Sequence, residues 1–398
     1  MDGRKRARSS GQSTGSGLRV GSEPAAKPGR RNAALDGLRA VAALSVFGFH
    51  AWLYTLSDVR MLAAPATLGN EIFAELRVGL VLFFVLSGFL LYRPWVRSAL
   101  EGSAAPSTVT YTVRRIGRII PAYWLAIIGS ALLLYPLAGS PGVRLPPVEL
   151  LPLFFIFAQN FSPQTLLKLD PPMWTLAVEA AFYVVLPAVG WLALRGRGSR
   201  HWQLAVPALL LVLGIAFNYV LAQQAVGSPR WSKSLPAMLP YFAVGMLAAV
   251  AVNRRSVSSW ASRLLIALGL LLVAADIAAH VEDIEALPII RDLPGAVGFA
   301  LIVGVSALRP PRLLELRPLV WVGTISYGLY LWHVPVLLVL RANGLVPLNP
   351  WGATLIALPI SLLLGWLSLR FVETPAMAWS RRTKVLGANL SGSSRRSA

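Results

Sequence analysis

Long apolar stretches recur along almost the whole chain, and polar residues gather in the segments between them. Ten of these stretches approach or reach the roughly 20 residues that an α-helix needs to cross a bilayer. They are residues 38–57, 78–95, 118–137, 172–194, 202–222, 235–252, 264–281, 293–308, 319–340 and 352–370. The pattern predicts an all-α polytopic membrane protein with about ten transmembrane helices.

A further apolar run, residues 148–161, is too short to cross the bilayer as a helix and contains Pro152. It is predicted to be a re-entrant or interfacial segment. If it does not cross, the outer segments hold eight of the 37 Lys and Arg residues and the cytoplasmic segments hold the other 29. If it crosses, the three arginines between the fourth and fifth spans lie outside. The positive-inside rule favours the first arrangement, with both termini cytoplasmic and residues 138–171 as an outer loop.

Composition agrees with a membrane protein, because 56% of the residues are hydrophobic and only 14% are charged, with a mean hydropathy of +0.61. The first 30 residues are basic and rich in Ser and Gly, without the apolar core of a secretory signal peptide. We therefore expect a disordered cytoplasmic tail at 1–32, a membrane domain at 33–380 and a second basic tail at 381–398.

The net charge of +20 is explained by topology and attraction to the inner leaflet, so no nucleic-acid partner is expected. The chain has no cysteine, which excludes disulfides, thiolate metal sites and thiol nucleophiles. No metal site and no tightly bound cofactor are predicted.

The first span carries two ionisable residues, Arg39 and His50. They are eleven residues apart, which places them on one helix face about 16 Å apart along the axis. Asp36 lies on the same face and predicts an acid–arginine pair at the cytoplasmic mouth. A neutral imidazole can lie deeper and still accept a proton. Packing against a neighbouring helix is the alternative role for His50.

In the fourth span, Thr175, Glu179 and Tyr183 follow i,i+4 spacing on one face. Glu179 lies about 9–10 Å from the outer end, and its own helix offers no basic partner at that depth. His50 is expected at a similar depth when counted from the opposite side. The two side chains could therefore meet.

The third span begins with a cluster of arginines, Arg114, Arg115 and Arg118, at i,i+3 and i,i+4 spacing. The cluster is either a positive-inside anchor or a phosphate clamp, since guanidinium groups bind phosphate oxygens in pairs. Ser87 and Gly88 in the second span mark a place where helices or a ligand can approach closely.

In the ninth span, Ser326, Tyr330 and His333 lie on one stripe. His333 is interpreted as a structural or substrate-facing residue rather than a catalytic one.

His280 and Asp276 lie near the outer end of the seventh span, where the simplest interpretation is that they face water. Arg370 and Glu373, near the end of the chain, are expected to form a self-contained pair at the inner surface.

Taken together, these motifs resemble the integral-membrane acyltransferase-3 family. The matching stretches, in the order of that family, are LDGLRAVAALSVFGFH, FFVLSGFLLYRP, RRIGRIIPAYW, MWTLAVEAAFYVVLP, ISYGLYLWHVPV and RFVETP, and they cover nearly all of residues 33–379. The resemblance implies a ten-helix O-acyltransferase that takes an acyl group, acetyl or another short chain, from acyl-CoA at the cytoplasmic side.

The family's signature of Arg, ten residues and His falls on Arg39 and His50. Its paired-arginine motif falls on the cluster described above, and its closing glutamate falls on Glu373. Many relatives carry an additional extracytoplasmic domain, whereas this chain is expected to handle its acceptor within the membrane domain.

Transfer of an acyl group from a thioester to a hydroxyl needs a base, cationic groups for a phosphorylated carrier and donors for the oxyanion. His50, Arg39 and Glu179 are therefore the candidate catalytic residues, and Arg114, Arg115 and Arg118 the candidate acyl-CoA-binding residues. An acyl-histidine intermediate stays open, and no oxyanion donor is identified.

A transporter or exporter of a lipid-linked or small polar substrate is the alternative function, which inverted repeats would favour; none is evident. The resemblance leaves the acceptor open among surface glycans, glycolipids and natural products such as macrolides. The preference for Arg over Lys, 32 to 5, indicates a bacterial source, and we expect a multi-pass protein of the bacterial plasma membrane.

Overall fold

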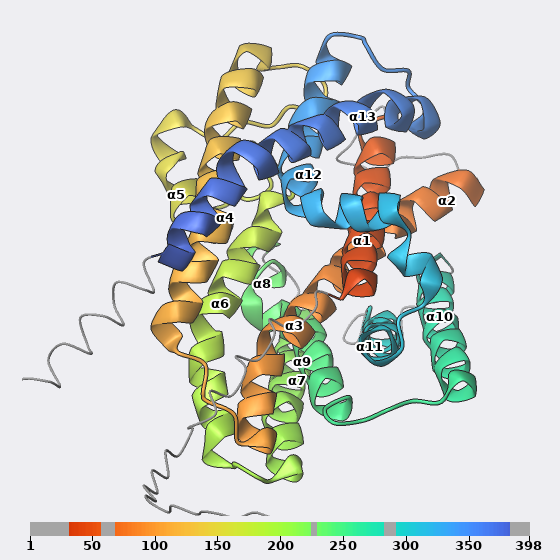
Figure 1. Cartoon of the computed structure of the whole chain (residues 1–398). Helices are drawn as coiled ribbons and strands as arrows, with labels where there is room; N and C mark the ends of the chain where they lie inside the picture. The colour runs from red at the N-terminus through yellow and green to blue at the C-terminus, as the bar shows by residue number, and fades with distance from the viewer. Residues whose placement is uncertain (1–31, 57–67, 224–228, 282–291, 383–398) are drawn as a thin grey trace, which may run out of the picture. The chain divides into compact units, whose positions relative to one another are not determined.

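The computed structural model describes residues 32–56, 68–223, 229–281 and 292–382 (Figure 1). All regular secondary structure in these ranges is helical, and they contain no strand. The predicted tails, residues 1–32 and 381–398, lie almost entirely outside the described residues.

Each of the ten predicted spans coincides with a helix. The ten helices are α1 Ala33–Leu53, α3 Gly79–Glu101, α4 Thr108–Leu134, α6 Met173–Arg195, α7 Arg200–Ala222, α9 Leu235–Ala251, α10 Ser259–Val281, α11 Leu293–Leu308, α12 Arg317–Ala342 and α13 Pro350–Ser368. Among the described residues, nine helices are long and apolar enough to cross a membrane, and α11 is shorter with 16 residues. The predicted fold class is confirmed.

Short elements connect or extend these helices. They are α2 Leu68–Glu75, α5 Pro152–Phe155, α8 Pro229–Ser232, the 3₁₀ turns η1 Leu76–Val78, η2 Tyr135–Leu137, η3 Val148–Leu150, η4 Gln159–Phe161 and η5 Arg312–Glu315, and the π-helical turn η6 Leu369–Glu373.

Polar caps mark several of the helix ends. The side chains of Asn32, Ser107, Ser199 and Asn349 accept hydrogen bonds from backbone N–H groups in the first turns of α1, α4, α7 and α13. These bonds satisfy donors that a helix N-terminus otherwise leaves unpaired. At its other end, α3 stops at Gly102, which has a φ of 70° that glycine adopts without steric cost.

The helices pack in pairs, chiefly α1 with α12, α3 with α9, α7 with α9, α10 with α11 and α12 with α13. In the α3–α9 pair, a Cβ on Gly88 would lie 2.1 Å from the Phe242 carbonyl oxygen, and one on Gly245 would lie 2.1 Å from that of Val85. The two backbones therefore touch, as small residues allow in membrane helices. The close approach expected at Gly88 is confirmed.

The apolar run 148–161 forms no helix longer than the four residues of α5. It packs against the start of α6 instead. Gln159 Nε2 donates to the Met173 carbonyl at 2.9 Å, and Asn160 Nδ2 donates to the Trp174 carbonyl at 2.8 Å. The segment therefore does not span as a helix, which agrees with the predicted arrangement; the side of the membrane on which it lies stays a prediction.

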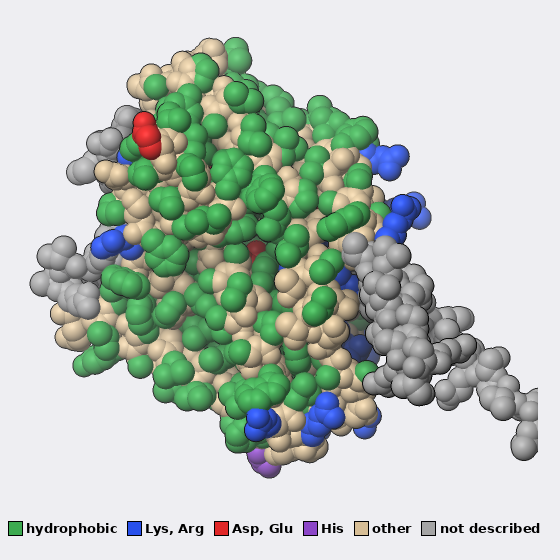
Figure 2. Space-filling model, turned by 90° about the vertical axis from the view of Figure 1, so that its left-hand side faces the viewer, with side chains coloured by type: hydrophobic (Ala, Val, Ile, Leu, Met, Phe, Trp, Pro, Cys, Tyr) green, Lys and Arg blue, Asp and Glu red, His purple; other side chains and the backbone are tan. Residues whose placement is uncertain are grey.

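Large apolar side chains cover the outer faces of several spans. Leu132 of α4, Val184 of α6, Leu271 of α10 and Leu355 of α13 are among the exposed ones. Figure 2 shows a broad hydrophobic face with Lys and Arg toward its margins. Such a surface suits contact with lipid tails, with charged groups at the polar boundaries.

Candidate functional site

Two cavities adjoin each other within the helical bundle. The inner cavity, about 340 Å³, is lined by Arg39, Arg115, Arg118 and Glu179 among others. The outer cavity, about 530 Å³, is lined by His50, Arg77, Arg144 and Lys233 among others. "Inner" and "outer" refer to the faces assigned by the charge distribution. Both cavities share four lining residues: Leu80, Phe84, Thr175 and Tyr330.

His50 lies on the last turns of α1, and one of its ring nitrogens is fully engaged. Nδ1 lies 2.8 Å from the Val46 carbonyl oxygen and 3.2 Å from Nε2 of His333. His333 comes from α12 and is buried, with 1% of its surface exposed. Its own Nδ1 lies 2.7 Å from the Tyr330 carbonyl oxygen.

These contacts assign the tautomers of both rings. A carbonyl oxygen only accepts, so Nδ1 carries the hydrogen in His50 and in His333. Nε2 of His333 is then an acceptor for the Nδ1–H of His50. Nε2 of His50 keeps a free lone pair, which is the state that a general base requires. The sequence indicated a structural or substrate-facing role for His333 but not its contact with His50, because the two residues are 283 positions apart.

Arg39 and His50 lie on the same face of α1 but line different cavities. Nη1 of Arg39 donates to Asp36 Oδ1 at 3.3 Å, so the predicted Asp36–Arg39 pair is confirmed; its place at the cytoplasmic face stays a prediction. Arg39 lines the inner cavity and His50 the outer one.

Glu179 faces the inner cavity, together with Thr175 and Tyr183, as the i,i+4 spacing predicts. Its Oε1 accepts a 2.7 Å hydrogen bond from Ser87 Oγ. The structure does not bring Glu179 and His50 together. Counting residues from the helix ends predicted a similar depth in the membrane for the two side chains. It could not predict the direction in which each side chain points from its helix.

The arginine cluster of α4 divides into two parts. Arg115 and Arg118 line the inner cavity, whereas Arg114 is exposed and lies outside its lining. The Arg115 guanidinium lies over the rings of Tyr111 and Tyr183, with 5.8 and 5.7 Å to the ring centroids. Two of the three predicted phosphate-binding arginines are thus in a position to face one ligand.

The boundary between the cavities carries two hydroxyl groups. Thr175 Oγ1 and the Tyr330 hydroxyl are 2.6 Å apart, and each also contacts the carbonyl oxygen of Pro172. Since Thr175 and Tyr330 line both cavities, this pair lies where a ligand would pass from one cavity to the other.

Glu373 is buried, with 1% exposed, and accepts a 3.4 Å hydrogen bond from Ser368 Oγ. Its charged neighbour is Arg118, not Arg370, which is exposed. The expected Arg370–Glu373 pair is therefore wrong. The π-helical turn Leu369–Glu373 widens the helix, so residues three apart no longer lie above one another.

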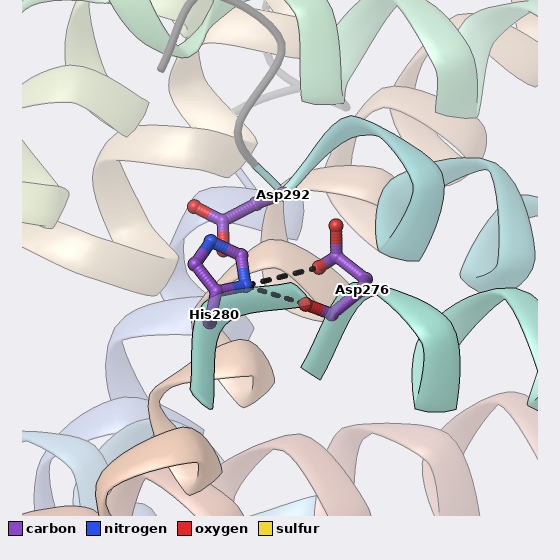
Figure 3. A group of neighbouring side chains, drawn as sticks. All are labelled: Asp276, His280 and Asp292. Carbon is purple, nitrogen blue, oxygen red and sulfur yellow. Dashed lines mark hydrogen bonds and ion pairs between the residues drawn. The ribbon is translucent and has the colours of Figure 1, made fainter. Parts of the chain in front are cut away.

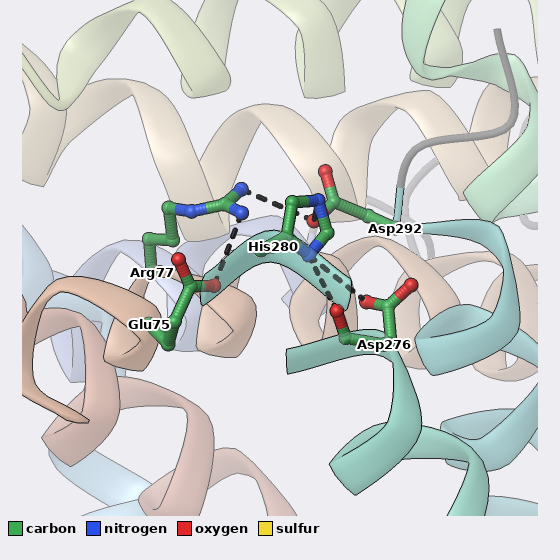
Figure 4. Close-up of polar contacts among 5 residues, drawn as sticks. All are labelled: Glu75, Arg77, Asp276, His280 and Asp292. Carbon is green, nitrogen blue, oxygen red and sulfur yellow. Dashed lines mark hydrogen bonds and ion pairs between the residues drawn. The ribbon is translucent and has the colours of Figure 1, made fainter. Parts of the chain in front are cut away.

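An ion-pair network occupies the outer ends of η1, α10 and α11 (Figures 3 and 4). Arg77 donates to Glu75 Oε2 and to Asp292 Oδ1, both at 3.1 Å. His280 Nδ1 donates to the Asp276 carbonyl at 2.6 Å, and its Nε2 lies 3.6 Å from Asp292 Oδ1.

This network corrects the expectation that Asp276 and His280 face water, because Asp276 is only 4% exposed. Candidate metal-ligand atoms of Asp276, His280 and Asp292 lie within 4.8 Å of one another. The ion pair with Arg77 and the hydrogen bond of His280 already explain this proximity. Through Arg77 and Asp292, the network also forms part of the outer cavity wall.

The fold and the site therefore define a multi-pass helical membrane protein with two histidines in contact and an arginine-lined inner cavity. A family profile described as an acyltransferase domain matches residues 32–370. The chain belongs to this family, acyltransferase 3, and at the level of the family it is a membrane O-acyltransferase. The transporter alternative is not supported.

Several bacterial proteins are similar to the chain. The exopolysaccharide production protein ExoZ of Rhizobium meliloti is 29% identical over 322 residues, covering 79% of this chain and 93% of ExoZ. Nodulation protein 10 of Rhizobium leguminosarum bv. viciae is 28% identical over 390 residues, covering 91% and 97%. The peptidoglycan O-acetyltransferase OatA of Listeria monocytogenes is 26% identical over 375 residues, covering 86% of this chain and 55% of OatA.

The chain thus spans about half the length of OatA but nearly all of the two rhizobial proteins. None of the three names concerns a macrolide, so a macrolide acceptor receives no support. No solved structure matches the chain.

Proposed function

We propose that the protein transfers a short acyl group, most simply acetyl, from cytoplasmic acyl-CoA to a hydroxyl of a glycan in the outer cavity. The base is His50. By this proposal it acts in the plasma membrane of a bacterium, as the bacterial relatives suggest.

The inner cavity has the chemistry expected for the donor. Coenzyme A carries phosphate groups, and Arg115 and Arg118 line the cavity beside Arg39. Guanidinium groups bind phosphate oxygens through paired, charge-assisted hydrogen bonds. With the carrier held there, its thioester would reach the boundary formed by Thr175 and Tyr330.

In the reaction, Nε2 of His50 takes the proton of the acceptor hydroxyl while the oxygen attacks the thioester carbonyl. The new C–O bond forms, the C–S bond breaks, and the thiolate leaves. The proton on Nε2 then passes to the thiolate sulfur, which restores the neutral imidazole. During these steps His333 and the Val46 carbonyl hold the His50 ring through Nδ1.

A glycan acceptor agrees with the names of the relatives. OatA is named for O-acetylation of peptidoglycan and ExoZ for production of exopolysaccharide. The observation that carries the proposal is the fixed His50 tautomer beside the boundary of an arginine-lined cavity.

The test is acetyl transfer from labelled acetyl-CoA to cell-surface glycan in membranes that contain the full chain. His50→Gln should lower transfer by roughly 10²–10⁴-fold, the usual effect of losing a general base, with normal expression and thermal stability. His201→Gln is the matched control, because His201 is exposed on α7; it should keep full activity. A folded, active His50→Gln protein would show that His50 only packs.

A further inference from the structure

The two hydroxyl groups at the boundary between the cavities share a single carbonyl acceptor. Thr175 Oγ1 lies 2.6 Å from the Tyr330 hydroxyl oxygen, and these two oxygens lie 3.1 and 2.9 Å from the Pro172 carbonyl oxygen. Three contacts of hydrogen-bond length therefore join three oxygens. Each hydroxyl has only one hydrogen to donate, so the pair fills two of these contacts at a time.

The Pro172 carbonyl does not depend on either hydroxyl. It also accepts a 3.1 Å hydrogen bond from the backbone N–H of Thr175. A hydroxyl that turns from this carbonyl toward a ligand therefore leaves no buried acceptor unpaired, which is the loss that makes such a turn costly in a protein interior. The hydrogen that points at Pro172 is thus available to a ligand at the boundary.

Tyr330 is the better hydrogen-bond donor of the two. A phenol is more acidic than an aliphatic alcohol, so it donates a stronger hydrogen bond to an anionic oxygen. When Thr175 donates to the phenolic oxygen, the tyrosine hydrogen is the one directed at Pro172, and the incoming bond polarises the phenolic O–H further. The ring of Phe83 contacts the Tyr330 ring edge to face, with 5.9 Å between the centroids, and helps to hold it in place.

The surroundings of the pair are dry and apolar. Thr175 and Tyr330 are 5% and 8% exposed, and the other two residues that line both cavities are Leu80 and Phe84. A fixed hydrogen-bond donor stabilises developing charge far more strongly where water is excluded than in bulk solvent. The boundary therefore combines such a donor with the surroundings in which it is effective.

Tyr330 is also tied to the proposed base through one turn of α12. Its backbone carbonyl oxygen lies 2.7 Å from Nδ1 of His333, whose Nε2 lies 3.2 Å from Nδ1 of His50. Tyr330 and His50 both line the outer cavity. One helix turn therefore carries the hydroxyl and supports the imidazole.

We propose that the Tyr330 hydroxyl is the oxyanion donor of the acyl transfer and that Thr175 positions it. This inference rests on the proposed function and adds a catalytic group to it. When the acceptor oxygen attacks the thioester carbonyl carbon, an electron pair of the C=O bond moves to the carbonyl oxygen. The Tyr330 O–H turns from Pro172 and donates a hydrogen bond to that oxygen, without giving up its proton. As the C=O bond re-forms and the C–S bond breaks, the hydroxyl returns to Pro172.

The main test is Tyr330→Phe, which removes only the hydroxyl. Thr175 can still donate to Pro172, so thermal unfolding of the purified chain in detergent should stay as in wild type. With labelled acetyl-CoA and cell-surface glycan, kcat should fall about 10²–10³-fold, the usual effect of losing one oxyanion donor. KM for acetyl-CoA should stay unchanged, because the lost bond forms only in the transition state.

Tyr135→Phe is the matched control. The Tyr135 hydroxyl also donates to a proline carbonyl, that of Pro146, at 2.8 Å, but Tyr135 lies outside the lining of both cavities. This variant should keep the wild-type kcat. A folded Tyr330→Phe protein that also keeps the wild-type kcat would overturn the proposal. So would a rise in KM for acetyl-CoA with kcat unchanged, which would show that the hydroxyl only binds the ground state.

The positioning role of Thr175 is tested by a pair of substitutions. Thr175→Val removes the hydroxyl at similar volume and should lower kcat about 2–10-fold, the size expected for one neutral hydrogen bond. Thr175→Ser keeps a hydroxyl and should restore most of the activity, with KM unchanged in both. An active valine variant with an inactive serine variant would show that the methyl group packs and that the hydroxyl does not position Tyr330.

Mass spectrometry of the chain after incubation with labelled acetyl-CoA, without acceptor, separates an oxyanion donor from a nucleophile. A label on Tyr330 would overturn the proposal, since an acylated phenol has no hydrogen to donate. Failure of the proposed function appears elsewhere, as full activity in His50→Gln. The oxyanion forms whichever group acts as the base, so kcat of Tyr330→Phe decides this proposal in that case too.

Discussion

The two cavities are both cationic, but they are built differently. The arginines of the inner cavity lie on the long helices α1 and α4, whereas Arg144 and Lys233 of the outer cavity lie in connecting segments. Groups on packed helices are held more rigidly than groups on loops, and loops accept sequence change more readily. The difference suggests a fixed site for a common donor and an adaptable site for the acceptor.

The largest effect that would test this comparison is expected for substitutions in the inner cavity. Arg115→Ala and Arg118→Ala should each raise KM for acyl-CoA about 10–100-fold, since a hydrogen bond to a charged group contributes about 1.5–3 kcal/mol. Steady-state kinetics with varied acetyl-CoA provide the measurement. KM for the glycan should stay unchanged.

Arg114→Ala is the control within the same cluster, because Arg114 is exposed outside the cavity lining. It should behave as wild type. If all three variants have equal effects, the cluster acts as a whole at the membrane surface, and the assignment of the inner cavity to the donor fails.

A smaller effect is expected at His333, which positions His50. His333→Leu removes the acceptor of the His50 Nδ1–H, and a neutral hydrogen bond contributes about 0.5–1.5 kcal/mol. We expect kcat to fall about 2–10-fold with KM for both substrates unchanged.

His333→Gln restores a hydrogen-bond acceptor and should recover part of the activity. This rescue separates positioning from packing, since a purely packing role would make Leu the better replacement at this buried site. An active His333→Leu with an inactive His333→Gln would contradict the positioning role.

The helices and the inner cavity could be predicted far better than the outer cavity. Span length is a local property of hydropathy, and Glu179 and Tyr183 share a face because one helix fixes their spacing. The contact between His50 and His333 depends on how two distant helices are rotated. Arg144 and Lys233 lie in loops, whose paths no periodicity describes.

The smallest predicted effect concerns the loop that supports the outer cavity. Asp170 is 1% exposed, and within the described residues neither carboxylate oxygen has a hydrogen-bond partner. Burial raises its pKa in the folded state well above the usual value. The unfolded chain therefore releases this proton at a lower pH than the folded protein does, and stability falls as pH rises above the unfolded pKa, near 3.9.

Asparagine at this position resembles the neutral carboxyl and does not titrate. Asp170→Asn should therefore unfold at a higher temperature than wild type at pH 7, with a gain that shrinks toward pH 4. As an order of magnitude, each kcal/mol corresponds to roughly 2–4 °C in a medium-sized domain. Thermal unfolding of both proteins in detergent at several pH values provides the measurement. Because every other titrating group is shared, the difference between the two curves isolates Asp170, and a difference that does not change with pH would show that this carboxyl is not held neutral by burial.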